Sequence, residues 1–180
     1  MLDRDGVINE AVRDGYVTSP DMVRLLPGAA DAIAGLNEAG YGVIVISNQR
    51  CVGKGLITQT VLNTITTRLQ NLIYEHSGGV VERFYYCTHL LSDNCPCRKP
   101  KPGLIMAAQK DYGFDPAQTY LVGDSLTDMQ AARAAGCPNI FVRTGIDAHI
   151  LENNQAPACK PDHVARDLAD AVDFVLTKAG

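Results

Sequence analysis

Two aspartates separated by a single residue lie at the start of the sequence. Asp3 and Asp5 flank Arg4 and precede Gly6. If this segment ends a strand, one carboxylate can attack a phosphorus atom while the other reaches the leaving oxygen. Taken alone, the pattern is better explained as an aspartate-rich turn in which glycine supplies a positive φ. The chemical interpretation therefore depends on residues further along the chain.

A second pair of acids occurs at Asp124 and Asp128, where a glycine closes a candidate strand and a helix begins. Acids at this position commonly cap the helix, and Asp128 needs no other explanation. A carboxylate at the strand exit can also join Asp3 in binding Mg²⁺, which prefers a few carboxylates with water and phosphate. We therefore predict a magnesium site that contains Asp3 and Asp124.

Cationic and hydroxyl side chains complete the set that phosphate chemistry requires. Lys99 can spread its charge over transferring phosphoryl oxygens and keep the crowded acids from repelling one another. Ser47 and Asn48 leave an apolar strand and offer small donors for phosphate oxygens. The structural alternatives are a solvated basic pair of Lys99 with Arg98 and the simple end of a strand.

Four soft or borderline metal ligands lie within eleven residues, at Cys87, His89, Cys95 and Cys97. Their number matches a closed tetrahedral zinc site, and a zinc ion with no open ligand position would be structural. The alternative is three reduced thiols that only pack. The remaining cysteines lack a partner at ligand spacing and are interpreted as free: Cys51, Cys137 and Cys159.

Short apolar runs alternate with helical patterns, as expected when crossover helices join parallel strands. Strands are predicted at 42–47, 84–87, 120–122, 140–142 and 163–165. Helices are predicted at 28–39, 58–78, 103–112 and 127–135 and from 168 onward, and a surface loop is predicted at 147–162. We therefore expect an α/β fold with a doubly wound, Rossmann-like parallel sheet, helices on both faces, a minimal cap and a zinc-binding loop at 87–97. Its carboxyl edge would bring the reactive residues together.

Length and charge narrow the class of protein. The 180 residues fit one domain spanning 1–180. The net charge of −4 argues against nucleic acid or membrane surfaces as partners, since both attract basic proteins. The first residues lack the apolar region of a signal peptide, so we expect a cytoplasmic protein. We expect it to be a monomer that acts on a small phosphorylated molecule.

Four segments occur in the order of the motifs of haloacid dehalogenase-like (HAD) phosphatases: LDRDGVIN, VIVISNQ, CRKPKPG and VGDSLTDMQAA. With the zinc pattern, the chain resembles the small-capped branch that contains heptose bisphosphate phosphatases and histidinol-phosphatases. The segments at 15–17 and 53–55 and the FVRTG ending look more like the heptose enzymes. That resemblance implies removal of the 7-phosphate from D-glycero-D-manno-heptose 1,7-bisphosphate in lipopolysaccharide core synthesis. Hydrolysis of histidinol phosphate in histidine biosynthesis is the runner-up.

The resemblance also implies roles for individual residues. Asp3 would be the nucleophile and Asp5 the general acid and then base, while Mg²⁺ would be held by Asp3, the Asp5 backbone carbonyl and Asp124. Ser47 and Lys99 would steady the phosphoryl group. Contacts to the sugar or its second phosphate are implied for Asp14, Gly15, Tyr16, Asn48, Gln49, Arg50, Arg98 and Ser125. The family's first strand normally has several apolar residues before the nucleophile, whereas here only Met1 and Leu2 precede Asp3. We expect this strand to be short or to begin upstream.

Two functions of other classes compete with the hydrolase. A phosphate-accepting receiver switch also combines a doubly wound sheet with an aspartate, Mg²⁺, a hydroxyl and a lysine. A receiver, however, has no need of an acid two residues after the phosphorylated aspartate, where Asp5 stands. A zinc-dependent interaction module would leave Asp3, Asp5 and Asp124 unexplained, so the enzyme is favoured.

Overall fold

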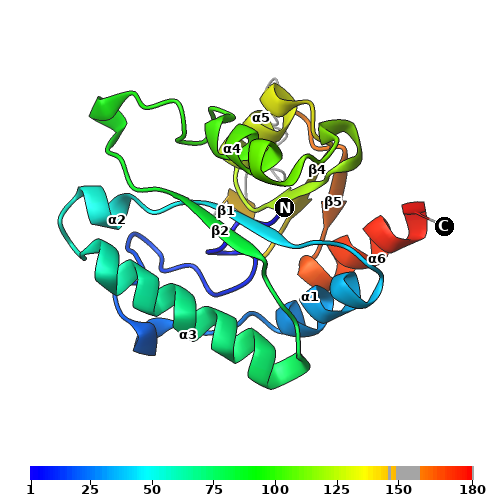
Figure 1. Ribbon diagram of the computed structural model, residues 1–180, viewed down its shortest axis with the longest axis horizontal. Helices are drawn as coiled ribbons and strands as arrows, with labels where there is room; N and C mark the ends of the chain where they lie inside the picture. The colour runs from blue at the N-terminus through cyan, green and yellow to red at the C-terminus, as the bar shows by residue number, and fades with distance from the viewer. Residues whose placement is uncertain (146, 149–158, 180) are drawn as a thin grey trace.

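The computed structural model describes residues 1–145, 147–148 and 159–179 (Figure 1). The strands are β1 (Ile44–Asn48), β2 (Arg83–Cys87), β3 (Leu121–Gly123), β4 (Asn139–Val142) and β5 (His163–Ala165). The α-helices are α1 (Ala29–Glu38), α2 (Arg50–Gly53), α3 (Gln59–Ser77), α4 (Gly103–Tyr112), α5 (Leu126–Ala135) and α6 (Leu168–Ala179). Single 3₁₀ turns occur at Pro20–Met22, Leu91–Asp93 and Pro116–Gln118.

These elements agree closely with the predicted ones. The predicted strands and the longer helices are all present, with ends that differ from the predicted ends by at most about two residues. The short helix α2 was not predicted, because a single turn contains too few positions to show a helical period. Most of the surface loop predicted at 147–162 lies outside the described residues.

Residues 1–3 connect the two parts of the sheet. Leu2 forms parallel bridges with Val45 in β1 and with Val122 in β3. Its backbone nitrogen donates to Ile44 O at 2.9 Å, and the backbone nitrogen of Asp3 donates to Val122 O at 2.9 Å. With β2 beside β1 and with β3, β4 and β5 in sequence, this yields one parallel sheet. Within this sequence the first strand is short, and it places Asp3 at the carboxyl edge in the middle of the sheet.

Helices cover both faces of the sheet, as predicted (Figure 1). On one face Val43 and Val45 pack with α1, α3 and α6 in the larger buried cluster. On the other face Ile44 and Ile46 pack with α4 and α5 in a second cluster. This alternation follows from the two-residue period of a strand, and a strand buried on both sides reads as a continuous apolar run. The fold is thus a doubly wound α/β sheet.

The ends of the longest helix match the signals in the sequence. Thr58 is the N-cap of α3, and its hydroxyl oxygen accepts from Val61 N at 3.2 Å. Gly78 ends the helix with φ of 75°, a left-handed conformation that glycine adopts without steric cost. Among the described residues, none of the helices is long and apolar enough to cross a membrane.

Candidate active site

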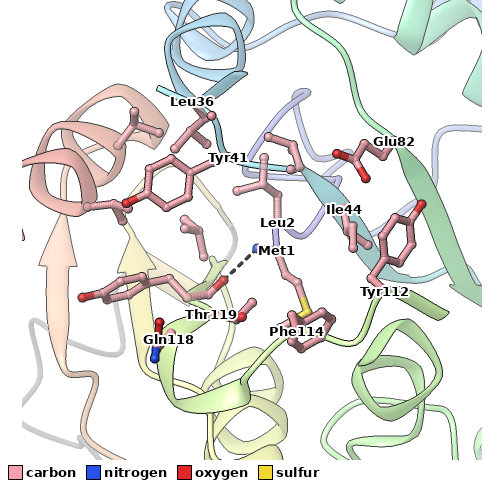
Figure 2. Close-up of a pocket in the computed structure, with 17 residues that line it drawn as sticks. Met1, Leu2, Leu36, Tyr41, Ile44, Glu82, Tyr112, Phe114, Gln118 and Thr119 are labelled. Atoms are coloured by element: carbon pink, nitrogen blue, oxygen red, sulfur yellow. Dashed lines mark hydrogen bonds between the residues drawn. The ribbon is translucent and has the colours of Figure 1, made fainter. Parts of the chain in front are cut away.

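A cavity of about 270 Å³ opens at the carboxyl ends of the strands, the edge at which open parallel sheets bind ligands. Its described wall includes predicted site residues from several elements: Asp3, Asp5, Gly15, Tyr16, Ser47, Asn48, Lys99, Asp124 and Ser125. A cavity of about 340 Å³ lies at the opposite, amino end of the sheet beside Met1 and Leu2 (Figure 2). Its described lining is mainly apolar, with Glu82 as the one charged side chain. Only the carboxyl edge therefore offers the grouped acids and the lysine that phosphate chemistry needs.

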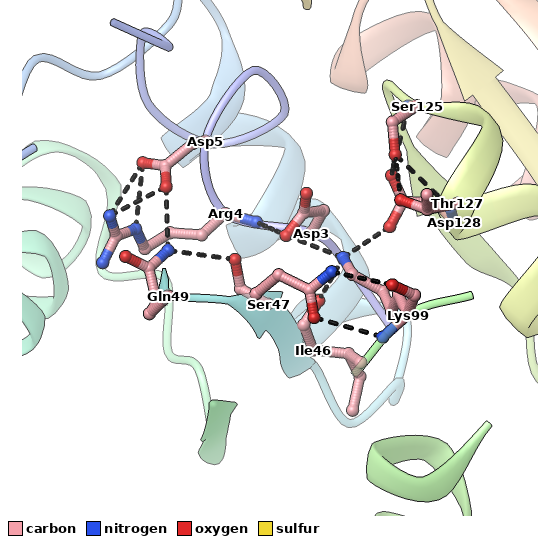
Figure 3. Close-up of polar contacts among 11 residues, drawn as sticks. Asp3, Arg4, Asp5, Ile46, Ser47, Gln49, Lys99, Ser125, Thr127 and Asp128 are labelled. Carbon is pink, nitrogen blue, oxygen red and sulfur yellow. Dashed lines mark hydrogen bonds and ion pairs between the residues drawn. The ribbon is translucent and has the colours of Figure 1, made fainter. Parts of the chain in front are cut away.

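Asp3 and Lys99 form the centre of the site (Figure 3). Lys99 Nζ lies 3.0 Å from Asp3 Oδ1, donates to Ile46 O at 2.9 Å and also pairs with Asp128. The backbone nitrogen of Arg4 donates to the same Asp3 oxygen at 2.7 Å. Lys99 is 3% exposed, so its ammonium has little access to water. Two donors therefore hold the Asp3 carboxylate in one orientation at the cavity wall.

Burial and charge act on this pair together. Burial raises the pKa of Asp3 to about 6, with Lys99 opposing the shift and Asp128 adding to it. Burial lowers the pKa of Lys99, but the carboxylates of Asp128 and Asp3 outweigh this effect and raise it above its ordinary value. Lys99 is therefore positively charged and lies between two carboxylates. Because the single charge of Lys99 balances only one of them, a net negative charge remains in this part of the site.

Asp124 adds a third carboxylate to this group. One oxygen from each of Asp3, Asp124 and Asp128 lies within 4.8 Å of the others. A Cβ atom at Gly145 would lie 1.7 Å from Asp124 Oδ2, and one at Gly6 would lie 2.5 Å from it. Both glycines are therefore required for Asp124 to reach this position. A compact set of carboxylate oxygens suits the small, hard Mg²⁺ ion.

Asp5 lies at the cavity wall, but its carboxylate is turned toward Arg4 and Gln49 rather than toward Asp3 (Figure 3). Arg4 Nε and Nη2 donate to Asp5 Oδ1 at 3.0 and 2.9 Å, and Nη2 also donates to Oδ2 at 2.8 Å. Asn9 Nδ2 donates to Oδ1 and Gln49 Nε2 to Oδ2, each at 2.8 Å. Together these donors fix the position of the Asp5 carboxyl group.

The last two residues of β1, Ser47 and Asn48, and the residue that follows, Gln49, make different contacts. The hydroxyl of Ser47 accepts from Gln49 Nε2 at 3.2 Å, and Ser47 opposes the rise in the pKa of Asp3. Asn48 Nδ2 donates to Lys99 O, and Asn48 Oδ1 accepts from Lys99 N, both at 3.1 Å. The predicted contacts of Asn48 and Gln49 with a sugar remain predictions. In this structure their amides brace Lys99 and Asp5, respectively.

The four predicted zinc ligands converge at the end of β2. Cys87 Sγ lies 3.5 Å from Cys95 Sγ and 3.3 Å from Cys97 Sγ, while Cys97 Sγ is 3.3 Å from His89 Nδ1. All four ligand atoms lie within 4.8 Å of one another. Ligands of a tetrahedral zinc ion with Zn–S bonds of about 2.3 Å lie about 3.7 Å apart. The cluster could therefore hold zinc, with His89 bound through Nδ1.

Comparisons with known proteins agree with this geometry. The HAD-hydrolase-like family model matches residues 96–171. The D-glycero-D-manno-heptose-1,7-bisphosphate 7-phosphatase of Thermosynechococcus vestitus is 36% identical over 98% of this chain and 94% of that protein. A D-glycero-beta-D-manno-heptose-1,7-bisphosphate 7-phosphatase of Neisseria meningitidis is 41% identical over 98% of this chain and 93% of that protein. The chain belongs to this heptose bisphosphate phosphatase family. These relatives confirm the resemblance to the heptose bisphosphate phosphatases that the sequence motifs predict.

A solved member of the heptose bisphosphate phosphatase family has the same fold. The crystal structure of D,D-heptose 1,7-bisphosphate phosphatase from B. bronchiseptica, complexed with magnesium and phosphate, matches with a TM-score of 0.90 and 38% identity. The match covers 98% of this chain and 97% of that one. This chain is therefore a phosphatase of the HAD superfamily, and the competing prediction of a receiver switch is not favoured.

The other predicted substrate contacts differ in how they relate to the cavity: Tyr16 lines it, whereas Arg50 contacts Tyr16. Tyr16 accepts at its hydroxyl from Arg50 Nε at 2.9 Å, and Lys54 Nζ lies 5.1 Å from the centre of its ring. Burial would raise the pKa of Tyr16, but Arg50 and Lys54 lower it below its ordinary value. Asp14, with φ of 57°, lines a neighbouring hollow rather than the main cavity.

Arg98 and Ser125 differ in how they are partnered. Nε and Nη1 of Arg98 are shielded from solvent and have no hydrogen-bond partner among the described residues. The hydroxyl oxygen of Ser125 accepts from Asp128 N at 3.4 Å and lies 2.6 Å from Asp128 Oδ2, in a capping box at the start of α5. Ser125 therefore helps to position Asp128 in addition to lining the cavity.

Sequence reasoning missed three residues of the site. Asp128 is a helix cap, as predicted, but it is also fully buried against Lys99. Asp128 also belongs to the second pair of acids in the sequence, and this pairing was a usable signal. Arg4 and Asn9 hold Asp5 and are each 1% exposed. The sequence contains no comparable signal for Arg4 and Asn9. From the sequence alone, Arg4 is interpreted as a polar residue in a turn.

Proposed function

We propose that this chain removes the 7-phosphate of D-glycero-D-manno-heptose 1,7-bisphosphate through an aspartyl-phosphate intermediate on Asp3. The observation that carries the mechanism is the Asp3 carboxylate, held at the cavity wall 3.0 Å from the Lys99 ammonium. The curated relatives of the same family support the choice of substrate, since they are named for it at 36 to 41% identity.

The reaction follows from the positions of the acids. An oxygen of Asp3 attacks phosphorus, the bond from phosphorus to the sugar oxygen breaks, and Asp5 gives that oxygen a proton. Water then attacks the phosphorus of the aspartyl phosphate while Asp5 takes a proton from it, which releases phosphate, restores the Asp3 carboxylate and returns Asp5 to its protonated form. Lys99 and the hydroxyl of Ser47 hold the phosphoryl oxygens throughout.

Mg²⁺ would be held by Asp3, Asp124 and the backbone carbonyl of Asp5. When bound, it supplies positive charge that lets an anionic phosphate approach three carboxylates. Asp128 keeps Lys99 in place beside this position, because the two side chains form an ion pair that is shielded from water. Zinc at Cys87, His89, Cys95 and Cys97 would have a structural role.

Three basic residues support a substrate with two phosphates. Arg50 and Lys54 lie around Tyr16, which lines the cavity, and Arg98 has two shielded nitrogens without a partner in the described chain. Shielded guanidinium nitrogens without partners are energetically costly, and an anion can offset that cost. A second phosphate would meet these cations, whereas the amine of histidinol phosphate would be repelled by them.

A side-by-side assay tests the substrate. We expect kcat/KM for heptose 1,7-bisphosphate to exceed that for histidinol phosphate by about 100-fold or more. We expect Arg98→Ala to lower kcat/KM more for the bisphosphate than for a small monophosphate. Arg68→Ala is the matched control, since Arg68 lies on α3 and its nearest acid is Glu75 at 3.9 Å. The opposite ranking would make the chain a histidinol-phosphatase and leave the aspartyl-phosphate mechanism intact.

We further propose that residues 1–180 act as one domain and as a monomer in the cytoplasm, within lipopolysaccharide core synthesis. The acidic net charge of −4 supports a small-molecule substrate over nucleic acid. Light scattering of the purified chain tests the monomer: a mass near 19.4 kDa is expected, and twice that mass would contradict it.

A further inference from the structure

Gln49 is buried and makes contacts that the proposed reaction has not used. It is 1% exposed, follows β1, and does not line the cavity. Its Nε2 donates to Asp5 Oδ2 at 2.8 Å and to Ser47 Oγ at 3.2 Å (Figure 3). Both amide hydrogens are thus directed at residues with proposed catalytic roles.

The orientation of this amide is determined by its neighbours. Gln49 Oε1 lies 3.7 Å from Cys51 Sγ, which donates to it. Turning the amide over would place its oxygen against the Asp5 carboxylate, so that two acceptors would face one another. The backbone nitrogen of Gln49 donates to Cys87 O at 2.7 Å, which ties the residue to the end of β2. Gln49 therefore has one favourable arrangement.

Gln49 holds Asp5 from a different element than the other donors do. Arg4 and Asn9 lie on the same loop as Asp5, so their contacts move with that loop. Gln49 instead follows a central strand and joins the loop to the sheet across 44 residues of sequence. Its contact thus determines where Asp5 lies relative to Asp3, which is part of the sheet.

The second contact of Gln49 orients Ser47. A hydroxyl has one hydrogen and two lone pairs, and here one lone pair accepts from Gln49. The hydrogen of Ser47 is then free to point away from Gln49, into the cavity that Ser47 lines. One buried amide therefore sets the direction of both the acid and the hydroxyl.

We infer that Gln49 is a positioning residue that places the Asp5 carboxyl group for proton transfer to the leaving oxygen. The inference rests on the proposed role of Asp5 as general acid. When Gln49 is lost, Asp5 remains attached to Arg4 and Asn9 but its position relative to the sheet is no longer maintained. Proton transfer should then suffer more than phosphate binding or attack by Asp3.

The dependence of the rate on the leaving group tests this role. A sugar alcohol leaves poorly and needs a proton, whereas p-nitrophenolate leaves well without one. For Gln49→Met, which keeps the volume and removes both donors, we expect kcat/KM for a sugar phosphate to fall about 10- to 100-fold. For p-nitrophenyl phosphate we expect a fall of less than about 3-fold, because the transfer of phosphorus to Asp3 then needs little acid catalysis. A distortion of the whole site would lower both values equally.

Two further variants complete the experiment. Gln70→Met is the matched control, because Gln70 also makes two amide contacts, to the backbone of Gly79 and Val81, but on α3 away from the cavity. It should leave both rates unchanged. If Gln49→Met fails to fold, Gln49→Asn keeps both donors on a side chain one carbon shorter and should show the same selective loss.

The possible results separate the two proposals. Equal losses on both substrates, or no loss on either, would overturn the positioning role of Gln49. Asp5→Asn should show the same selectivity with a larger loss, and if it does not, the acid role of Asp5 fails and the role of Gln49 fails with it. If the wild-type chain hydrolyses another alkyl phosphate in place of the heptose, that substrate serves in the comparison, and only the substrate proposal is lost.

Discussion

At the scale of single residues, the site is a balance of buried charges. Lys99 lies between Asp3 and Asp128, with 3% of its surface exposed. In such surroundings, removing one partner costs far more than a surface ion pair contributes, since the remaining charge loses both its partner and its hydration. The same arrangement fixes the orientation of Asp3 before substrate arrives, as its proposed attack on phosphorus requires.

We expect Asp3→Asn to abolish phosphate release and to leave the fold intact, because an amide is a very poor nucleophile. Asp5→Asn should be slowed by about 100-fold or more. Phosphate release in the presence of Mg²⁺ measures both, and circular dichroism checks the fold. Normal turnover by Asp3→Asn would exclude the aspartyl-phosphate mechanism.

We expect Asp128→Asn to lower the free energy of unfolding by about 3 kcal/mol and to reduce kcat, since it leaves Lys99 with one carboxylate in a buried site. Urea unfolding measures the first effect and steady-state kinetics the second. Asp31→Asn is a control with a similar change in charge, because Asp31 is exposed on α1 and pairs with His76 at the surface. If the two variants unfolded at the same urea concentration, the buried pair would have no structural role.

At the scale of elements, the loop after β2 connects the proposed zinc site to the active site. The cysteine and histidine ligands lie at 87–97, directly before Arg98 and Lys99. Cys87 also accepts at its backbone oxygen from Gln49 N. A metal ion that fixes this loop would therefore fix the residues that follow it.

We expect the purified protein to contain about one zinc per chain, and we expect Cys95→Ala to lose the metal and melt at a lower temperature that Mg²⁺ does not restore. Metal analysis and thermal melting measure these effects. Cys137→Ala is the control: Cys137 is a buried cysteine that is not one of the four converging side chains, so the variant should keep its zinc. Freshly purified protein without zinc would rule out the site.

At the scale of the whole molecule, one short segment unites the sheet. Leu2 bridges β1 and β3 through its backbone, and its side chain is 2% exposed in the larger buried cluster. Asp3, the proposed nucleophile, therefore lies on the segment that connects the two halves of the sheet. The position of the Asp3 carboxylate therefore depends on how well Leu2 packs in the core.

We expect Leu2→Ala to lower the free energy of unfolding by about 3 kcal/mol, because it leaves a cavity in the core. Leu56→Ala removes the same atoms from a side chain that is 55% exposed, and it should change stability by less than about 0.5 kcal/mol. Urea unfolding of both variants provides the comparison. If the two variants lost the same free energy of unfolding, burial of Leu2 would contribute no more to stability than an exposed leucine does.

The sequence by itself determined the order of the elements and the chemistry of the main residues. Apolar runs, caps and glycines predicted the strands and longer helices, because these signals act over a few residues. The spacing of Cys87, His89, Cys95 and Cys97 predicted their convergence for the same reason, and the structure confirms that they meet. Asp3, Lys99 and Asp124 were predicted to meet because parallel strands place their carboxyl ends at one edge.

Only the tertiary structure decided which partners the reactive side chains have. Asn48 braces Lys99 across 51 residues of sequence and Gln49 holds Asp5 across 44, distances over which local patterns carry no information. The pairing of Asp128 with Lys99 likewise requires α5 to pack beside the segment before α4. Hydrogen bonds and ion pairs between buried groups depend on angles and distances that exist only after the sheet is assembled, so their donors and acceptors could be named from the sequence but not matched.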